Sequence, residues 1–459
     1  MKLYNTLTHQ IEEFVPQNPD EVKIYTCGPT VYSYAHIGNF TSYTYWDLLI
    51  RVLRLNGYQE KRILNITDVG HLTSDADDGE DKMEKGARRE GKTVWEVAQM
   101  YMDDFLENFH NLGLIEPAAI CRATDFIEAD KRLVEALDKA GYLYDTTDGL
   151  YFDTSKFPKY AEFARLDLEN LRAGARVEFS DEKRNASDFV VWKWIRDGED
   201  HAMQWEYRGR MGYPGWHLEC STIIHEQLGE PIDIHCGGVD HIPVHHTNEI
   251  AQSEGAFGKQ MSKFWLHNNF ITIDGQKISK SLGNVYYFSD LAEKGYSPMD
   301  YKMWLYQGHY QAERDFSFEQ LAAAHARLMN YRNFAALRWQ EIEKSDFAAE
   351  RDEIMECLNS NLNSAGAFAV LDGVAKSGLA PSNEFLKFVD DAFGLEIGKT
   401  TPDISDELKQ KIFERSAAKE SKEYATADQL RDEILEQGIE LLDSADGVKW
   451  ALRIKNRVC

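Results

Sequence analysis

The chain has 459 residues, of which 43% are hydrophobic and 28% are charged, as in a globular enzyme of about three domains. No stretch approaches the roughly 18 consecutive apolar residues of a transmembrane helix, so the sequence excludes a membrane span. Glu12 and Glu13 stand where a secretory signal needs apolar residues, and six cysteines are too few for a disulfide scaffold. We therefore expect a cytoplasmic protein with no membrane partner.

The net charge of −26 argues against a protein that coats nucleic acid without specificity. It does not exclude an enzyme that acts on nucleic acid, because basic stretches at residues 82–92 and 449–457 can form local stripes on an acidic body. A solvated charged surface remains the alternative interpretation of each stretch.

The first half of the chain alternates strand and helix patterns. Residues 22–27 predict a buried strand, a helix follows and ends at Gly57, and residues 61–66 predict the next strand. A helical stretch at 126–140 and a hairpin at 142–145 and 150–153 then indicate an inserted subdomain. The alternation resumes with a strand at 232–235 and a helix at 242–254, so we predict an α/β fold with a parallel sheet.

The second half has a different pattern. From about residue 316 to about residue 393, long helical patterns dominate, and residues 398–403 form a break that is poor in apolar residues. A final unit follows, with helices at 406–418 and 425–437. It closes with a hairpin at 439–442 and 448–454 around Asp446-Gly447.

Two loops have the composition of phosphate-binding sites. Residues 29–39 join the first strand to the start of a helix, where free N–H groups and the helix dipole favour anions; His36 can donate, and Gly38 lets a ring approach the backbone. Residues 277–281 place Lys277 and Lys280 beside two hydroxyls, which suits a triphosphate. A packed histidine and an exposed basic loop are the respective alternatives.

A third set of residues has the chemistry of a metal site. His245 and Glu249 are four residues apart on a predicted helix and so share a face, while Cys220 and Cys27 are distant in sequence. Two thiolates, one imidazole and one carboxylate can complete a tetrahedral zinc site. The alternative for each cysteine is a small buried hydrophobic side chain.

Taken together, these stretches resemble the cysteinyl-tRNA synthetase family, which belongs to the class I aminoacyl-tRNA synthetases. The similarity covers nearly the whole chain and is carried by residues 25–32, 36–39, 65–68, 215–221, 233–240, 245–252 and 277–284. It implies a split Rossmann-type catalytic domain with a parallel sheet and a connective insertion, then an α-helical bundle and a small C-terminal α+β unit. The implied boundaries are 1–120 and 206–270 for the catalytic halves, 121–205 for the insertion, 271–318 for a stem-contact region, 319–396 for the bundle and 404–459 for an anticodon-binding unit.

The resemblance also implies roles for individual residues. The zinc ligands would be Cys27, Cys220, His245 and Glu249. Catalytic residues that act on ATP would be His36, Asn39, Lys277 and Lys280, and the nucleotide would also contact Pro29, Thr30, Gly38, Gly238 and Asp240. The cysteine pocket would be lined by Gly28, Thr67, Trp216, His217 and His235.

The implied activity is ATP-dependent formation of cysteinyl-adenylate and transfer of the cysteine to tRNA(Cys), with one zinc ion that recognises the substrate thiolate and Mg²⁺ on the ATP. The expected partners are therefore tRNA(Cys), L-cysteine and ATP, and a monomer is expected. In the C-terminal unit, Trp450 beside Lys449 and Arg453 can stack on an unpaired base of the tRNA. Packing of Trp450 onto the preceding helices is an equal alternative.

Several positions depart from the family pattern. Asn39 replaces a histidine, Ile278 replaces a methionine, Cys236 replaces a glycine, and Thr247 replaces an acidic residue. The acidic stretch at residues 74–84 has an unusual form, and we expect a solvated loop there. Two other functions remain open: a ligase that joins cysteine to an amino sugar, whose C-terminus would be shorter, and a noncatalytic tRNA-binding paralogue, which would lose the lysine loop or the zinc ligands.

Overall fold

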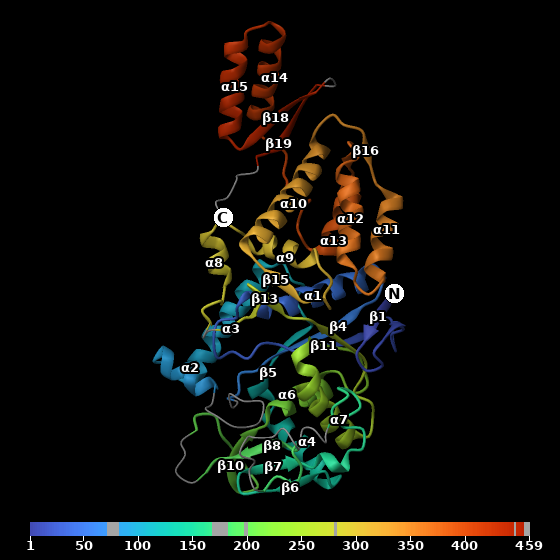
Figure 1. Cartoon of the computed structure of the whole chain (residues 1–459), viewed down its shortest axis with the longest axis vertical. Coiled ribbons are helices and arrows are strands. Elements are labelled where there is room, and N and C mark those ends of the chain that lie inside the picture. The colour runs from blue at the N-terminus through green and yellow to red at the C-terminus, as the bar shows by residue number, and fades with distance from the viewer. Residues whose placement is uncertain (71–81, 168–181, 197–200, 280–281, 445–446, 454–459) are drawn as a thin grey trace. The chain divides into compact units, whose positions relative to one another are not determined.

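The computed structural model describes residues 1–70, 82–167, 182–196, 201–279, 282–444 and 447–453 (Figure 1). The chain forms two compact units. The first comprises residues 1–272, 278–287 and 310–314, and the second comprises residues 273–277, 288–309 and 315–459. Each unit is described by itself below.

The first unit is built on a five-stranded sheet with the order β12-β11-β3-β4-β5, in which all neighbouring strands are parallel. Its strands are β3 (Val22–Thr26), β4 (Glu60–Ile66), β5 (Ala119–Arg122), β11 (Ile232–Gly238) and β12 (Ser262–Asn268). The chain adds strands outward from β3 to β5 on one side and from β11 to β12 on the other. The strand order therefore reverses between β3 and β11, and the carboxyl ends of these two strands are where a sheet of this kind places its ligand.

Helices connect these parallel strands, as the alternating pattern predicts. They are α1 (Ile37–Leu55), α2 (Lys82–Glu90), α3 (Val94–Asn111), α4 (Ile127–Lys139), α6 (Trp216–Gln227) and α7 (Thr247–Phe257). Most of α1 is buried, because apolar and aromatic residues occupy nearly all of its faces. A two-stranded antiparallel sheet of β1 (Lys2–Asn5) and β2 (Gln10–Glu13) precedes the parallel sheet.

The insertion is an antiparallel sheet with the order β6-β7-β8-β10-β9. Its strands are β6 (Leu143–Asp145), β7 (Gly149–Phe152), β8 (Phe189–Trp194), β9 (Trp205–Tyr207) and β10 (Arg210–Pro214). The hairpin predicted near residue 147 is confirmed as β6–β7. The insertion sheet extends to Pro214, beyond the expected end at residue 205, because β10 pairs with β8; strands as short as β9 and β10 carry too little alternation to be recognised in the sequence.

The second unit is mainly helical, as predicted. Its helices are α8 (Phe288–Glu293), α9 (Pro298–Tyr306), α10 (Phe318–Ala336), α11 (Ala348–Asn359), α12 (Ser364–Ala375), α13 (Asn383–Phe393), α14 (Asp406–Glu420) and α15 (Tyr424–Glu436). The final hairpin, β18 (Ile439–Ser444) with β19 (Gly447–Leu452), is also confirmed. The described residues also form the short strands β13 (Ile271–Ile273), β14 (Gln276–Lys277), β15 (Arg314–Phe316), β16 (Lys344–Ser345) and β17 (Ala380–Pro381), of which β13 and β15 begin in residues of the first unit.

Serine caps explain where several of these helices begin. Ser297, Ser317, Ser382 and Ser405 each accept a backbone N–H from the first turn of the helix that follows. None of the helices that the structure describes combines the length and the apolar character needed to cross a bilayer. The predicted fold class, a parallel α/β sheet with an insertion followed by helices and a small α+β unit, is confirmed.

Candidate active site

The candidate metal ligands converge at the point where the strand order reverses. Cys27 follows β3, Cys220 lies in α6, and His245 and Glu249 come from the segment after β11. One potential ligand atom from each of the four lies within 4.8 Å of the others, and all four residues are buried. Two sulfurs, one imidazole nitrogen and one carboxylate oxygen form a donor set that suits tetrahedral zinc.

The predicted helix around residue 245 begins with a π-helical turn, Ile242–His246, which leads into α7. His245 Nε2 lies 2.7 Å from Glu249 Oε1, so the two residues share a face as their spacing of four predicts. Thr247, one of the departures from the family pattern, donates its hydroxyl to the carbonyl of Ile242 at 2.7 Å and so fastens this turn. A π-helical turn inside a helix often marks a functional site.

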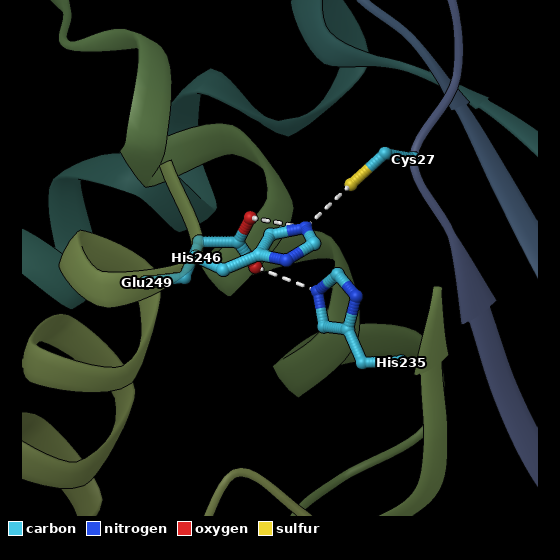
Figure 2. Close-up of side chains that lie close together, drawn as sticks. All are labelled: Cys27, His235, His246 and Glu249. Carbon is cyan, nitrogen blue, oxygen red and sulfur yellow. Dashed lines mark hydrogen bonds and ion pairs between the residues drawn. The ribbon is translucent and has the colours of Figure 1, made fainter. Parts of the chain in front are cut away.

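A second, overlapping group of donors was missed in the sequence. Figure 2 shows Cys27, His235, His246 and Glu249, whose donor atoms also lie within 4.8 Å of one another. His246 Nε2 is 3.3 Å from Cys27 Sγ, and His235 Nε2 is 2.7 Å from Glu249 Oε2. The signal for His246 was its place beside His245, but spacing along a regular helix gives no reason to turn both imidazoles toward one cluster.

The imidazoles are linked to each other as well as to the cluster. His217 Nδ1 and His245 Nδ1 are 2.9 Å apart, and His246 Nδ1 and His267 Nε2 are 2.7 Å apart. Thr6 Oγ1 lies 2.8 Å from His267 Nδ1. These contacts fix the ring orientations, so that His245 turns its Nε2 toward Glu249.

Burial and mutual interaction shift the pKa values of the four ligands in different directions. Burial raises the pKa of the Cys27 thiol. The pKa of Cys220 lies well above its usual range, because Cys220 is hydrogen-bonded to Cys27 and is also buried. Burial would lower the pKa of His245, but Glu249 and Cys220 outweigh it and raise the pKa to about 10. Burial opposes ionisation of Glu249, yet His235 and His245 hold its pKa well below the usual range. The contact between Glu249 and His245 therefore favours the charged forms of both residues, while burial favours the neutral forms of the two thiols.

The predicted cysteine-pocket residues contact members of this cluster or residues next to them in the chain. Trp216 opens α6, and its ring lies 4.6 Å from that of His245. His235 is fully buried and stacks on Trp265. Thr67 is 2% exposed and donates to Glu219 Oε2 at 2.9 Å. Gly28 approaches β4 so closely that an added Cβ would lie 1.6 Å from the Asn65 carbonyl oxygen, so only glycine fits there.

The expected nucleotide residues gather at the start of α1. His36 is the residue before the helix, and its backbone N–H donates to Asn39 Oδ1 at 3.0 Å. The Asn39 side chain is exposed, and its NH₂ group can still donate to a ligand. A Cβ on Gly38 would lie 2.7 Å from Ile278 Cδ1, so the segment after residue 277 covers this helix start. Tyr286 from the same segment accepts the N–H of Ile37 at 2.9 Å.

Of the remaining residues expected to contact the nucleotide, the structure describes all but Lys280. Thr30 bridges to Thr67, and the Pro29 carbonyl accepts the Thr67 N–H at 3.0 Å. A Cβ on Gly238 would lie 2.4 Å from Asp240 Oδ1, so the Asp240 side chain lies directly against the end of β11. Lys277 is exposed at the end of β14, and Lys280 lies outside the described residues, as does most of the acidic stretch at residues 74–84.

The C-terminal candidates separate into buried and exposed residues. Trp450 is 6% exposed and belongs to a cluster with Ile434 and Leu441. Its backbone N–H donates to Gln340 Oε1 at 3.1 Å, within the same unit. This is the packing alternative stated for Trp450, and stacking on a base would require the cluster to open. Arg453 is exposed and Lys449 is half-buried.

Comparisons with known proteins agree with this arrangement. The family model "tRNA synthetases class I (C) catalytic domain" matches residues 13–326. A protein of Burkholderia lata named cysteine–tRNA ligase 1 is 41% identical over 457 residues, covering 97% of this chain and 96% of that protein. A cysteine–tRNA ligase of Treponema denticola is 38% identical and covers 98% of this chain and 99% of that protein.

Among solved structures, the methionyl-tRNA synthetase of Mycobacterium tuberculosis in complex with methionyl-adenylate has a similar fold. Its TM-score is 0.58 at 17% sequence identity, and the match covers 78% of this chain and 81% of that one. At this identity the match concerns the fold alone. It agrees with the Rossmann-type parallel sheet of the first unit.

Proposed function

Because the chain belongs to the class I (C) tRNA synthetase family, we propose that it is a cysteine–tRNA ligase, which activates L-cysteine with ATP and transfers it to tRNA(Cys). The observation that carries the proposal is the buried set of two thiols, one imidazole and one carboxylate at the reversal of the strand order. The relatives named cysteine–tRNA ligase match almost the full length of the chain, which supports the same assignment.

The first step joins the amino acid to the nucleotide. A carboxylate oxygen of cysteine forms a bond to the α-phosphorus of ATP while the bond from that phosphorus to the bridging oxygen breaks, and pyrophosphate leaves with the electron pair. Such a displacement depends on alignment and charge neutralisation. At the start of α1, backbone N–H groups, the His36 imidazole and the Asn39 NH₂ group supply donors. By the family resemblance, Lys277 and Lys280 would add positive charge for the leaving pyrophosphate.

The second step transfers the activated cysteine. A terminal ribose hydroxyl of the tRNA forms an ester bond to the carbonyl carbon of the adenylate while the bond from that carbon to the phosphate oxygen breaks. AMP leaves with the electron pair, and the hydroxyl proton is released to solvent. Lys449 and Arg453 are the C-terminal cations that would contact tRNA phosphates. Trp450 packs in the hydrophobic cluster beneath the hairpin that carries them. A monomer and a cytoplasmic location remain our predictions, as do the regions named for the stem and the anticodon.

Zinc fits the residues of the site. Cys27, Cys220, His245 and Glu249 would hold it, and the contact between His217 and His245 would keep the ligating ring in place. When bound, zinc supplies a soft centre for the substrate thiolate, which a serine hydroxyl matches poorly. The Trp216 ring lies against that of His245, and the imidazoles of His217, His235 and His245 are buried.

Charging of unfractionated tRNA with labelled cysteine tests the proposal. We expect cysteine to be charged and serine to be rejected by about 10⁴, because a site built for one polar group rejects its isostere. Cysteine-dependent pyrophosphate exchange without charging would favour the amino-sugar ligase instead. Absence of both reactions with intact tRNA binding would favour the noncatalytic paralogue.

A further inference from the structure

A chain of hydrogen bonds, two of them buried, links the residues next to the two cysteines of the candidate metal site. It begins at Gly28, the residue after Cys27, and ends at Glu219, the residue before Cys220. The Gly28 N–H donates to Asn65 Oδ1 at 2.7 Å, Asn65 Nδ2 donates to Thr67 Oγ1 at 3.1 Å, and Thr67 Oγ1 donates to Glu219 Oε2 at 2.9 Å.

The direction of every bond in this chain is fixed by its first member. A backbone N–H can only donate, so Asn65 must turn its oxygen toward Gly28 and its NH₂ group toward Thr67. The Thr67 oxygen then accepts from Asn65, and its single proton goes to Glu219. A hydroxyl has one proton and two lone pairs, so Thr67 keeps one lone pair and nothing further to donate.

A ligand that reaches Thr67 must therefore donate to it. Of the groups on a free amino acid with a thiol, the ammonium donates, whereas the carboxylate and the thiolate only accept. Thr67 is 2% exposed, so a ligand group that reached its oxygen would meet it away from solvent. Glu219 is 1% exposed, and its carboxylate lies directly behind the hydroxyl, where its negative charge favours a cation.

We propose that Glu219 is a positioning residue that holds Thr67 as an acceptor for the α-ammonium of the amino-acid substrate. The thiolate would then point to the metal cluster and the ammonium to Thr67, so that two fixed groups orient the substrate before its carboxylate reacts. This inference rests on the proposed function for the identity of the substrate. It assigns Glu219 an indirect role, because the residue acts through Thr67.

A neighbouring acid provides a matched control. Asp130 on α4 is fully buried, and burial raises its pKa well above the usual range, with the nearby charge of Glu219 adding to the shift. An Asp130→Asn substitution therefore changes a buried acid close to Glu219 with little change in charge. It has no place in the hydrogen-bond chain that ends at Thr67.

The test compares two thiol ligands that differ only in the ammonium. Binding of L-cysteine and of 3-mercaptopropionate to the zinc-loaded full chain is measured by calorimetry for the wild type, Glu219→Gln and Asp130→Asn. Glu219→Gln should weaken cysteine binding about 10-fold and leave 3-mercaptopropionate within about twofold of the wild type, because a hydrogen bond to a charged group is affected only when the ammonium is present. Asp130→Asn should change neither.

Two further variants keep the inference testable if Glu219→Gln does not accumulate as folded protein. Thr67→Val should show the same selective loss for cysteine, about 10- to 100-fold, and Thr67→Ser should restore most of the binding. Equal weakening of both ligands, or no weakening of either, would overturn the assignment of Glu219. Wild-type pyrophosphate exchange, measured separately, decides the proposed function: binding that discriminates the ammonium without exchange would overturn the function and keep the inference.

Discussion

The two ends of the candidate active site consist of different kinds of groups: buried side chains at one end and mainly backbone N–H groups at the other. The end that would take the thiol consists of buried side chains: Cys27, Cys220, His245 and Glu249 are each no more than 7% exposed, and other imidazoles hold them in place. The end that would take the phosphates consists of the backbone at the start of α1, with the half-exposed His36 and the exposed Asn39. Rejecting a close analogue requires fixed, desolvated groups, whereas phosphate charge can be met by a helix start together with lysine side chains.

The largest effect should follow from removing a buried ligand. Cys220→Ala should lose most of the bound zinc and reduce cysteine activation on the order of 10⁴-fold, since the discrimination depends on the intact set. Zinc content by atomic emission and cysteine-dependent pyrophosphate exchange measure the two losses.

Cys236→Ala is the matched control, because Cys236 is also buried in the first unit but belongs to neither donor group. It should keep its zinc and its activity. Normal cysteine-dependent pyrophosphate exchange by Cys220→Ala would contradict the claim that the thiol end of the site depends on its buried side chains.

Zinc binding should depend steeply on pH. With the pKa of His245 raised to about 10 and the pKa values of both thiols raised, zinc must displace a proton from each of these three residues, while Glu249 is already ionised. Affinity should therefore rise with pH, by about 10³-fold per unit near pH 7. Calorimetry in two buffers of different ionisation enthalpy should report release of about three protons, whereas ordinary pKa values would release about two.

Glycine substitutions probe both ends in the same way. Gly28→Ala places a methyl group 1.6 Å from the Asn65 carbonyl oxygen, so backbone must move, and we expect a loss of about 3 kcal/mol and a Tm lower by about 5 °C or more. Gly38→Ala meets mainly the flexible end of Ile278 and the His36 ring, and should cost less than about 1 kcal/mol while raising the KM for ATP. Thermal unfolding and exchange kinetics separate the two, and equal losses of Tm would contradict this account.

The smallest effect should come from the departure at Ile278. Its Cδ1 atom covers Gly38, and methionine has a similar volume and greater flexibility, so Ile278→Met should change the KM for ATP by less than about twofold. Exchange at varied ATP concentration measures it. A larger change would show that the covering side chain shapes the nucleotide end more strictly than the exposed donors beside it suggest.

Much of the fold could be predicted from the sequence, because the patterns that determine it are local. The strands before Gly28 and before Thr67 and the final hairpin follow from apolar runs bounded by turn residues. The end of the insertion at Pro214 could not, since it depends on pairing between β8 and β10, which is a contact between distant segments.

For the site, as for the fold, local sequence patterns could be interpreted, whereas contacts between distant segments could not be predicted. The four candidate metal donors could be chosen from chemistry and helical spacing. The place of His246 in the second donor group, and its contact with His267, depend on ring orientations that no local pattern specifies. Trp450 could be interpreted as a stacking or as a packing residue until its burial was known. Glu219 was missed because its role depends on a chain of hydrogen bonds through Asn65 and Thr67.

X-ray absorption at the zinc edge, with and without L-cysteine, tests the central claim most directly. The account predicts about two sulfur and two nitrogen or oxygen neighbours in the free protein, and about one additional sulfur when cysteine is bound, with no change when serine is added. A zinc environment that cysteine leaves unaltered, or purified protein that binds no zinc, would contradict the claim that the buried donors at the strand reversal select the substrate by its thiolate.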